Sequence, residues 1–438
     1  MKILSVNTSD TGGGAAHAAY RIHQGVRQMG VDSRMFVKNK GTDDPNIYAL
    51  SDFVPANPVY RLFDWCAKKI KNQIQHSRWN KYPNRDSKYK SDLRSTCIHG
   101  ALQAIPYDIL HLHWINQRFL SIDELCKVHK PIVWTLHDSW PFCGVCHYFL
   151  DCEGYQHQCG QCPQLGSSYP DDLSHQVWMR KAEVYKDLDL HIVTPSRWLA
   201  DCARKSSLFR NVDIHVIPNG LDTDLFHPMT NEEIKTIAET QKETAVGAVL
   251  HAAIKKKDAN PTILYGAVNA ATDPIKGFDN LLSALHILDA QGFEAHLVVF
   301  GADKTELPMH FEHISVTFVG YIHDFIVLAA LYSMADVVVV PSATENLSYA
   351  IMESLSCGTP VVAFNIGGNG DMIVHQQNGY LAKRNNDRDL ANGIEWSINN
   401  DADKLLSHNA REKVVSHFAQ EIVAEQYLDL YNKIVNGN

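Results

Sequence analysis

The chain has 438 residues, of which 45% are hydrophobic and 20% are charged. This length exceeds a single typical core, so we expect two domains of about 200 residues each. The formal net charge of −9 argues against nucleic acid as a partner. No apolar run approaches the roughly 20 residues of a membrane span, and Met1–Asn7 begins as a strand without a signal-peptide pattern. We therefore expect a cytoplasmic protein with reduced thiols.

Short apolar strands alternate with helices along both halves of the chain, which predicts two α/β domains with parallel sheets covered on both faces. The predicted strands lie near residues 3–6, 33–37, 108–112, 132–136, 191–193, 214–217, 263–268, 296–300, 316–319, 337–340 and 361–364. A capping box is predicted at Ser121–Glu124. The predicted domains are residues 1–228 and 229–417, followed by a helix over 418–438 that is expected to return to the first domain. Within the second domain, the segment 231–260 is predicted to be a linker with one polar helix.

A basic window interrupts this pattern in the region of about residues 55–95. Between Tyr60 and Arg94 the chain has ten Lys or Arg residues and three Asp residues, with several aromatic residues among them. One interpretation is a helical excursion whose lysines are merely solvated. The alternative is a surface that meets anionic lipid head groups or a pyrophosphate-linked acceptor at the inner face of the plasma membrane.

Two carboxylates flank the start of a predicted helix in the second domain. Glu345 follows the apolar strand at 337–340, and Glu353 lies eight positions later inside the next helix. Such spacing alone is ordinary for a solvated helix face. This helix is mostly apolar, however, so it packs on the sheet and places both carboxylates where open α/β sheets bind ligands. The helix N-terminus between them favours a phosphate or another anion.

This segment resembles the glutamate-x7-glutamate signature of the family 4 glycosyltransferases, which have the GT-B fold of two Rossmann-like domains facing a cleft. The resemblance covers nearly the whole chain and is most specific over residues 341–380. It implies that Glu345 is a catalytic residue near the donor sugar and that Glu353 contacts the nucleotide ribose. The resemblance also implies donor contacts from Asn346, Leu347 and Ser348.

Transfer of a sugar from a nucleoside diphosphate requires stabilisation of the departing pyrophosphate charge. Lys276 lies at a strand-to-helix turn on the same predicted sheet edge as Glu345, and it resembles the family's phosphate-binding lysine. The family usually has an arginine shortly before this lysine, but residues 266–275 contain none. Arg384 is one candidate to replace that arginine. The other two alternatives are slower catalysis and a phosphate clamp that relies more on backbone dipoles.

In the first domain, three glycines precede a predicted helix. Gly12, Gly13 and Gly14 allow backbone N–H groups to approach a ligand closely, although a flexible loop without a ligand is the alternative. The resemblance implies that Gly13 and Gly14 lie over the cleft and touch the donor. It also implies, with weaker support, a phosphate contact from Arg197.

The string Thr135-Leu-His137-Asp138 ends a predicted strand of the first domain. A lone histidine is more often structural, but this string resembles the family's active-site histidine, which implies that His137 is catalytic and reaches the transferred sugar. Asp138 is predicted to orient that histidine or to face the acceptor. His113, at the end of the preceding strand, is predicted to line the acceptor side.

Five of the ten cysteines lie within twenty residues, at positions 143, 146, 152, 159 and 162. Paired thiolates on turns suit tetrahedral Zn²⁺, and a reducing compartment argues against disulfides, although free thiols and disulfides remain alternatives. The cluster resembles that of a subgroup of family 4 enzymes from bacterial exopolysaccharide pathways, including colanic acid. Aligned on that subgroup, the ligands would be Cys146, Cys152, Cys159 and Cys162, with Cys143 extra. The predicted zinc is structural, because a closed Cys₄ site has no open position for chemistry.

Together these features predict a retaining glycosyltransferase that moves a hexose from a UDP- or GDP-sugar to a saccharide acceptor, expected to be lipid-linked, in surface polysaccharide synthesis. The resemblance implies that no metal or other cofactor is needed for the chemistry itself. Two alternatives stay open from the sequence: a phosphorylase or epimerase on the same fold, and a non-catalytic subunit that binds a nucleotide-sugar.

Overall fold

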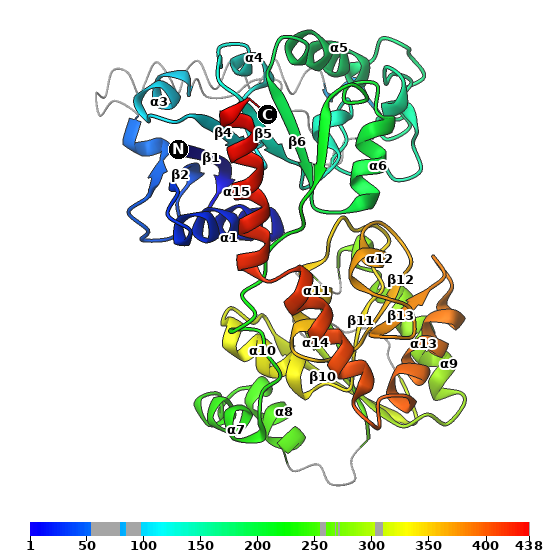
Figure 1. Ribbon diagram of the computed structural model, residues 1–438. Helices are drawn as coiled ribbons and strands as arrows, with labels where there is room; N and C mark the ends of the chain where they lie inside the picture. Colours follow the sequence, from blue (N-terminus) through cyan, green and yellow to red (C-terminus); the bar gives the residue numbers. More distant parts are fainter. Residues whose placement is uncertain are drawn as a thin grey trace. The chain divides into compact units, whose positions relative to one another are not determined.

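The computed structural model of the protein describes residues 1–53, 79–84, 98–254, 260–267, 269, 272–302 and 310–437. These residues form two compact units, shown in Figure 1. Unit 1 comprises Met1–Pro218 and Ala424–Asn438, and unit 2 comprises Asn219–Val423. Most of the basic window at residues 55–95 lies outside the described residues. None of the helices in the described ranges combines the length and the apolar character that a membrane crossing requires.

Unit 1 is built on a seven-stranded parallel sheet in the order β3-β2-β1-β4-β5-β6-β7. The strands are β1 (Lys2–Ser9), β2 (Asp32–Asn39), β3 (Ile47–Ala49), β4 (Ile109–Leu112), β5 (Ile132–Thr135), β6 (Leu190–Thr194) and β7 (Asp213–Val216). The central strands are apolar on both faces because helices and loops cover the sheet from both sides. In register, Val6 pairs with Leu112, and Leu112 pairs with Trp134.

The helices of unit 1 connect these strands. They are α1 (Gly14–Gln28), α3 (His99–Ala104), α4 (Ile122–Leu125), α5 (Leu173–Tyr185), α6 (Arg197–Lys205) and the part of α15 (Gln420–Asn436) that begins at Ala424. The predicted capping box before α4 is wrong. Ser121 occupies the N-cap position without a side-chain bond, and Glu124 instead accepts a hydrogen bond from the backbone N–H of Ile98 at 2.8 Å. The Glu124 carboxylate, which the capping-box pattern predicts to bond the helix start, is therefore bonded to the backbone N–H of a residue distant in the sequence.

The C-terminal part of α15 is anchored to the sheet of unit 1 by buried hydrogen bonds. Figure 1 shows α15, in red, beside the strands of this unit. The Tyr427 hydroxyl lies 2.9 Å from Thr135 Oγ1, and the Tyr431 hydroxyl lies 2.7 Å from His111 Nδ1. His111 Nε2 in turn lies 2.8 Å from the same Thr135 hydroxyl. These contacts join α15 to the ends of β4 and β5.

Unit 2 is built on a six-stranded parallel sheet in the order β10-β9-β8-β11-β12-β13. The strands are β8 (Thr262–Gly266), β9 (Ala295–Phe300), β10 (Ile314–Gly320), β11 (Val337–Val340), β12 (Val361–Phe364) and β13 (Gly379–Ala382). Strand β11 is an example of a strand that is apolar at every position because both of its faces are buried. Val337 and Val339 belong to the core on one face, and Val338 and Val340 belong to the core on the other face.

The helices of unit 2 form two layers. They are α7 (Asn231–Thr240), α8 (Ala245–Ile254), α9 (Phe278–Asp289), α10 (Phe325–Met334), α11 (Tyr349–Ser356), α12 (Asn369–Met372), α13 (Asp387–Asn399) and α14 (Leu405–His417). Helices α9 and α13 contribute to the core on one face, whereas α7, α8, α10, α11 and α14 contribute to the core on the other. The predicted linker at 231–260 is therefore wrong, because Ile234 and Leu250 are buried in the core of unit 2.

Two glycines allow loops at one edge of this sheet to pack closely. Gly277 has φ +72°, and a Cβ atom there would lie 1.9 Å from the carbonyl oxygen of Pro341. Gly367 has φ +50°, and a Cβ atom there would lie 1.7 Å from the carbonyl oxygen of Glu345. The loops are also joined by a backbone hydrogen bond from Ala343 N–H to the carbonyl of Ile275, at 2.8 Å. The loops that follow β8, β11 and β12 thus form one packed surface.

Replacing Gly277 by alanine should destabilise unit 2 through the contact with the Pro341 carbonyl. The matched control is Gly292→Ala, since Gly292 has φ +76° and no atom lies within 4 Å of the position that a Cβ would take there. The left-handed backbone should cost about 1 kcal/mol in both variants, and the steric contact should add about 2 kcal/mol or more at Gly277. Denaturant unfolding of both variants measures the difference. Equal losses would contradict the close packing.

Acidification should destabilise the protein through its buried histidines. Burial lowers the pKa of His111 to about 3, so the folded protein keeps it neutral while the unfolded chain protonates it below about pH 6.5. Each such imidazole should lower the free energy of unfolding by about 2 kcal/mol between pH 7 and pH 5. Urea titrations should show this loss reduced by about that amount in His111→Gln. The control His408→Gln, at a side chain that is 74% exposed, should keep the wild-type pH dependence.

Candidate active site

The predicted site residues fall into two groups, one in each unit. In unit 2 the strand order reverses between β8 and β11, because the chain runs outward from β8 through β9 to β10 and then returns to β11. Ligands of open α/β sheets bind at this switch point, beyond the carboxyl ends of the strands. Lys276 ends the short 3₁₀ helix that follows β8, and Glu345 lies in the loop after β11. Lys276 Nζ lies 2.9 Å from Glu345 Oε1.

The local structure fixes the turn that carries Lys276. The Asp273 carboxylate accepts a hydrogen bond from Ile275 N–H at 3.1 Å, and the Tyr265 hydroxyl donates to the carbonyl of Lys276 at 3.3 Å. The side chains of Lys276 and Glu345 are 30% and 16% exposed, so a ligand can still reach them. The pair is a cation and an anion held together at the switch-point edge of the sheet.

Glu353 lies on α11 and is 7% exposed. The Tyr332 hydroxyl donates to Glu353 Oε2 at 3.3 Å, and burial holds the pKa of that tyrosine well above its usual range. The other predicted donor residues of this unit, Asn346, Leu347 and Ser348, lie directly before α11. Ser348 occupies the N-cap position of α11 without a side-chain capping bond. The backbone at this helix start is therefore presented beside Glu345.

In unit 1 the switch point lies between β1 and β4, and predicted residues follow both strands. The loop after β1 contains Gly12 and Gly13, with φ values of +80° and +90°, and α1 begins at Gly14. No atom lies within 4 Å of the position a Cβ would take at Gly12 or Gly13. These glycines are thus required by backbone conformation. The buried Asp10 carboxylate holds the loop by accepting two backbone N–H bonds, at 2.6 and 3.0 Å, from residues 41 and 42.

His137 and His113 contact each other in the loops after β5 and β4. His113 Nδ1 lies 3.1 Å from His137 Nε2, and the rings are stacked with centroids 5.4 Å apart. The ring of His113 also lies 4.1 Å from that of His111. Burial lowers the pKa of His137 to about 4 and holds the pKa of His113 well below its usual range. Near neutral pH this is a chain of uncharged imidazoles, which can hydrogen-bond a sugar hydroxyl without carrying charge.

Asp138 is held by three donors. Its carboxylate accepts from Trp114 Nε1 at 2.8 Å and from the backbone N–H of Trp140 at 2.9 Å, and it lies 2.6 Å from His147 Nδ1. Burial alone would raise the pKa of Asp138, but His147 and the hydrogen bonds lower it overall. The pairing of His147 with Asp138 is not predicted from the sequence. A histidine nine residues after that aspartate is a weak signal, because the pairing depends on how the intervening loop folds.

The two predicted arginines lie elsewhere on the sheet edges. Arg197 is exposed at the first position of α6, after β6, and Ser196 caps that helix by accepting from Leu199 N–H at 3.1 Å. Arg384 is exposed in the loop after β13, two strands from β11 in the sheet order.

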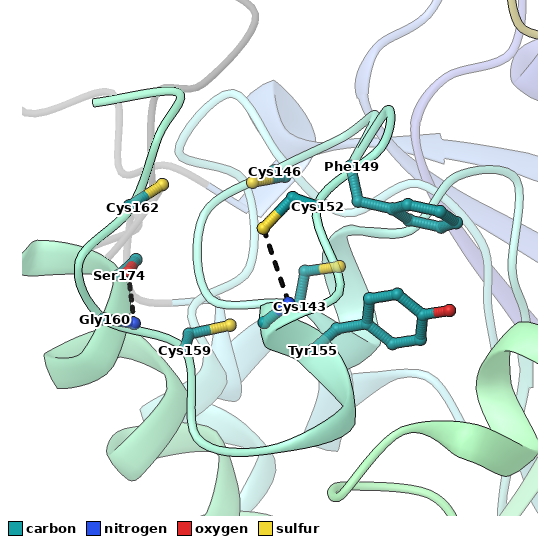
Figure 2. A pocket seen from close by; sticks show the side chains of 10 residues that line it. Cys143, Cys146, Phe149, Cys152, Tyr155, Cys159, Gly160, Cys162 and Ser174 are labelled. Carbon is teal, nitrogen blue, oxygen red and sulfur yellow. Dashed lines mark hydrogen bonds between the residues drawn. The ribbon is translucent and has the colours of Figure 1, made fainter. Parts of the chain in front are cut away.

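The cysteine cluster lines one pocket of unit 1 (Figure 2). Its five cysteines are Cys143, Cys146, Cys152, Cys159 and Cys162, joined by Phe149, Tyr155 and Ser174. All five are free thiols.

A second group of possible metal ligands lies on the neighbouring strands β6 and β7. The ligand atoms of His191, Asp213 and His215 lie within 4.8 Å of one another. Among the described residues no three cysteine sulfurs are that close to one another. This group of ligand atoms could not be predicted from spacing in the sequence, because its residues are brought together only by the pairing of β6 with β7.

Two family descriptions match the chain. The Glycosyltransferase Family 4 domain matches residues 12–225, and the Glycosyl transferases group 1 domain matches residues 251–413. An Escherichia coli K12 relative, WcaC, is named as a putative glycosyl transferase of colanic acid biosynthesis. It is 26% identical over 391 residues, which are 83% of each chain.

Solved structures share the fold. A glycosyltransferase from Rickettsia africae has a TM-score of 0.63 at 17% identity, covering 100% of this chain and 99% of that one. Anabaena HepE, solved in complex with UDP-glucose, has a TM-score of 0.61 at 16% identity, covering 99% and 100%. The predicted GT-B fold is confirmed. The chain therefore belongs to the glycosyltransferases, with a family 4 domain in its first half and a group 1 domain in its second.

Proposed function

We propose that this glycosyltransferase moves a hexose from a UDP- or GDP-sugar to a saccharide acceptor, with retention of the anomeric configuration. The observation that carries the proposal is the contact between Lys276 and Glu345, at 2.9 Å, across the switch point of unit 2. A lysine there can stabilise the diphosphate leaving group, and a neighbouring carboxylate can accept hydrogen bonds from sugar hydroxyls.

Glu353 completes the proposed donor site. A ribose presents two vicinal hydroxyls, and a carboxylate with two oxygens can accept a hydrogen bond from each. The start of α11 lies between Glu345 and Glu353 in the chain, and its N-terminal backbone dipoles favour the phosphates. We assign the leaving-group charge to Lys276 and this helix start, which together take the place of the absent arginine.

In unit 1, we assign the contact with the transferred sugar to His137. Its uncharged imidazole is oriented by His113, and the adjacent Asp138 is fixed by its own donors. A neutral ring can donate or accept a hydrogen bond with a sugar hydroxyl, whereas a cation would repel the developing positive charge at the reacting carbon. We place the acceptor on the side of His113 and Asp138.

The acceptor class rests on the relatives. WcaC is named for colanic acid biosynthesis, and a Staphylococcus aureus relative, CapM, is named for capsular polysaccharide biosynthesis. HepE binds UDP-glucose on the same fold. These names support a role in polysaccharide synthesis and a nucleotide-sugar donor. We further propose that the acceptor is lipid-linked and is met at the inner face of the plasma membrane. The basic window at residues 55–95 is the segment we assign to that contact.

Calorimetric titration of UDP, GDP, ADP and their common sugar conjugates tests the donor site. We expect one nucleotide to bind selectively. Lys276→Met should weaken binding of the diphosphate about 10- to 100-fold and leave binding of the bare nucleoside unchanged, because it removes a charge-assisted bond. Glu353→Gln should weaken the nucleoside itself about 10-fold, because the amide accepts at one oxygen only.

Two matched variants control these titrations. Lys235→Met and Glu232→Gln change an exposed lysine and an exposed glutamate of α7. Both should bind the nucleotide within about twofold of wild type. Absence of binding to every nucleotide, or equal loss in Lys235→Met and Lys276→Met, would contradict the proposed donor site.

A further inference from the structure

The cysteine pocket of unit 1 directs hydrogen-bond donors at several of its sulfurs. Backbone N–H groups donate to three of these sulfurs. The N–H of Gly144 donates to Cys159 Sγ at 3.3 Å, and the N–H of Gly154 donates to Cys152 Sγ at 3.4 Å. Cys162 accepts from the backbone of residues 164 and 165 and shares a hydrogen bond with Cys146. N–H bonds to sulfur stabilise a thiolate relative to a thiol.

The turn between Cys159 and Cys162 has an unusual backbone. Cys159, Gly160 and Gln161 have φ values of +51°, +107° and +45°. Two of these residues are not glycine, so the conformation is costly and must be held by its surroundings. Asp172 provides one support, because its buried carboxylate accepts the N–H of Cys162 at 2.8 Å.

Ser174 provides a second support for this turn. Its hydroxyl accepts the N–H of Gly160 at 2.9 Å, as Figure 2 shows. Gly160 itself leaves no room for a side chain, since a Cβ atom would lie 2.2 Å from the Pro170 carbonyl. The start of α5 thus fixes a strained turn that presents Cys159 and Cys162 to one pocket.

A buried lysine lies under the same pocket. Lys181 is 0% exposed, and its Nζ donates to the carbonyls of Trp140, Cys143 and Gly144, the last two at 2.8 and 3.1 Å. Nζ also lies 3.8 Å from the centre of the Trp140 ring. Its three hydrogen bonds therefore all go to uncharged backbone carbonyls. Burial lowers the pKa of Lys181 to about 7, and the neighbouring groups that act against this shift are the cysteines of the pocket and Asp138.

We propose that Cys146, Cys152, Cys159 and Cys162 bind one zinc ion as thiolates, with Lys181 as the buried counter-charge. Binding converts Zn²⁺ and four thiols into a tetrathiolate of net charge −2 and releases four protons. Cys143 is left out of the proposed set because a tetrahedral site takes four ligands, and its sulfur contacts the Ser139 side chain instead. The donor set fits zinc, which favours four cysteine sulfurs in tetrahedral geometry.

Metal binding must draw the sulfurs together. Among the described residues, no three cysteine sulfurs lie within 4.8 Å of one another, whereas four bonds of about 2.3 Å would place them roughly 4 Å apart. The cysteines lie on short turns around the pocket, so side-chain rotation and small loop shifts are enough. Zinc should therefore order the loops as it binds, and its removal should lower the melting temperature.

The site would hold the loop that follows His137. Cys146 is next to His147, which pairs with Asp138, and the Ser139 hydroxyl donates to the carbonyls of His147 and Cys146 at 2.8 and 3.2 Å. This consequence for the sugar site rests on the function proposed above. The metal site itself does not, so metal content and donor binding are measured separately.

The test is the zinc content of the untagged full chain after dialysis, measured by mass spectrometry. We expect about one zinc per chain in the wild type and less than about a tenth of that in Cys159→Ser. Cys143→Ala and Cys126→Ser, which change a buried and an exposed cysteine outside the ligand set, should keep the wild-type content. Lys181→Met should keep one zinc but weaken its affinity about 10-fold.

Two further measurements keep the proposal falsifiable if Cys159→Ser does not fold. Cobalt exchanged into the wild type should give the thiolate charge-transfer bands of a tetrahedral site, and Asp213→Asn should keep all the zinc. Wild-type protein without zinc, a cobalt spectrum without thiolate bands, or zinc lost in Asp213→Asn would overturn the proposal. Zinc bound normally in a chain that binds no nucleotide would leave this site standing and contradict the proposed function alone.

Discussion

The contact between Lys276 and Glu345 depends on most of the architecture of unit 2. It requires β8 and β11 to be parallel neighbours, and it requires the loops after them to approach within hydrogen-bonding distance. Gly277 and Gly367 permit that approach because neither position has room for a side chain. The gross attraction of such a pair is about 6 kcal/mol at an effective dielectric of 20, but desolvation and side-chain ordering reduce the net to about 1 kcal/mol. The pair therefore positions Lys276 more than it stabilises the fold.

Unit 1 places its predicted site residues by a different physical principle. His111, His113 and His137 form a chain of uncharged rings in which the first two are buried and His137 is partly exposed, and the hydroxyl of Tyr431 ends it from α15. Uncharged groups need no counter-ion, so the chain is held by hydrogen bonds and stacking alone. One consequence is that the predicted site residues of the two units differ in charge. The predicted phosphate-binding residues carry charge, whereas the predicted sugar-binding residues do not, as expected where one side stabilises a leaving anion and the other avoids a developing cation.

The parts of this structure that local chemistry determines can be predicted from the sequence. A mostly apolar helix that contains Glu353 is predicted from the sequence after Glu345, and the structure has α11 there, followed by Gly358-Thr359-Pro360. The sheet edges follow, since parallel strands bring their carboxyl ends to one side. Pairings that depend on the return of a distant segment cannot be predicted in this way. Ile98 displaces the expected cap at Glu124, and His147 reaches Asp138 only because the cysteine loop folds back.

Lys181 shows that the exposure of a charged side chain cannot be predicted from the charge pattern of the sequence alone. Arg180 and Lys181 are neighbours on α5 and would both be read as solvated, yet Arg180 pairs with Asp123 at the surface while Lys181 is buried beneath the Trp140–Gly144 segment. The ammonium holds that segment from inside by its carbonyls. Asp138 holds the other end by accepting the N–H of Trp140. The backbone directly after His137 is thus held at both ends, by Asp138 and by the buried Lys181. Without such supports, a loop following a strand would be among the mobile parts of the fold.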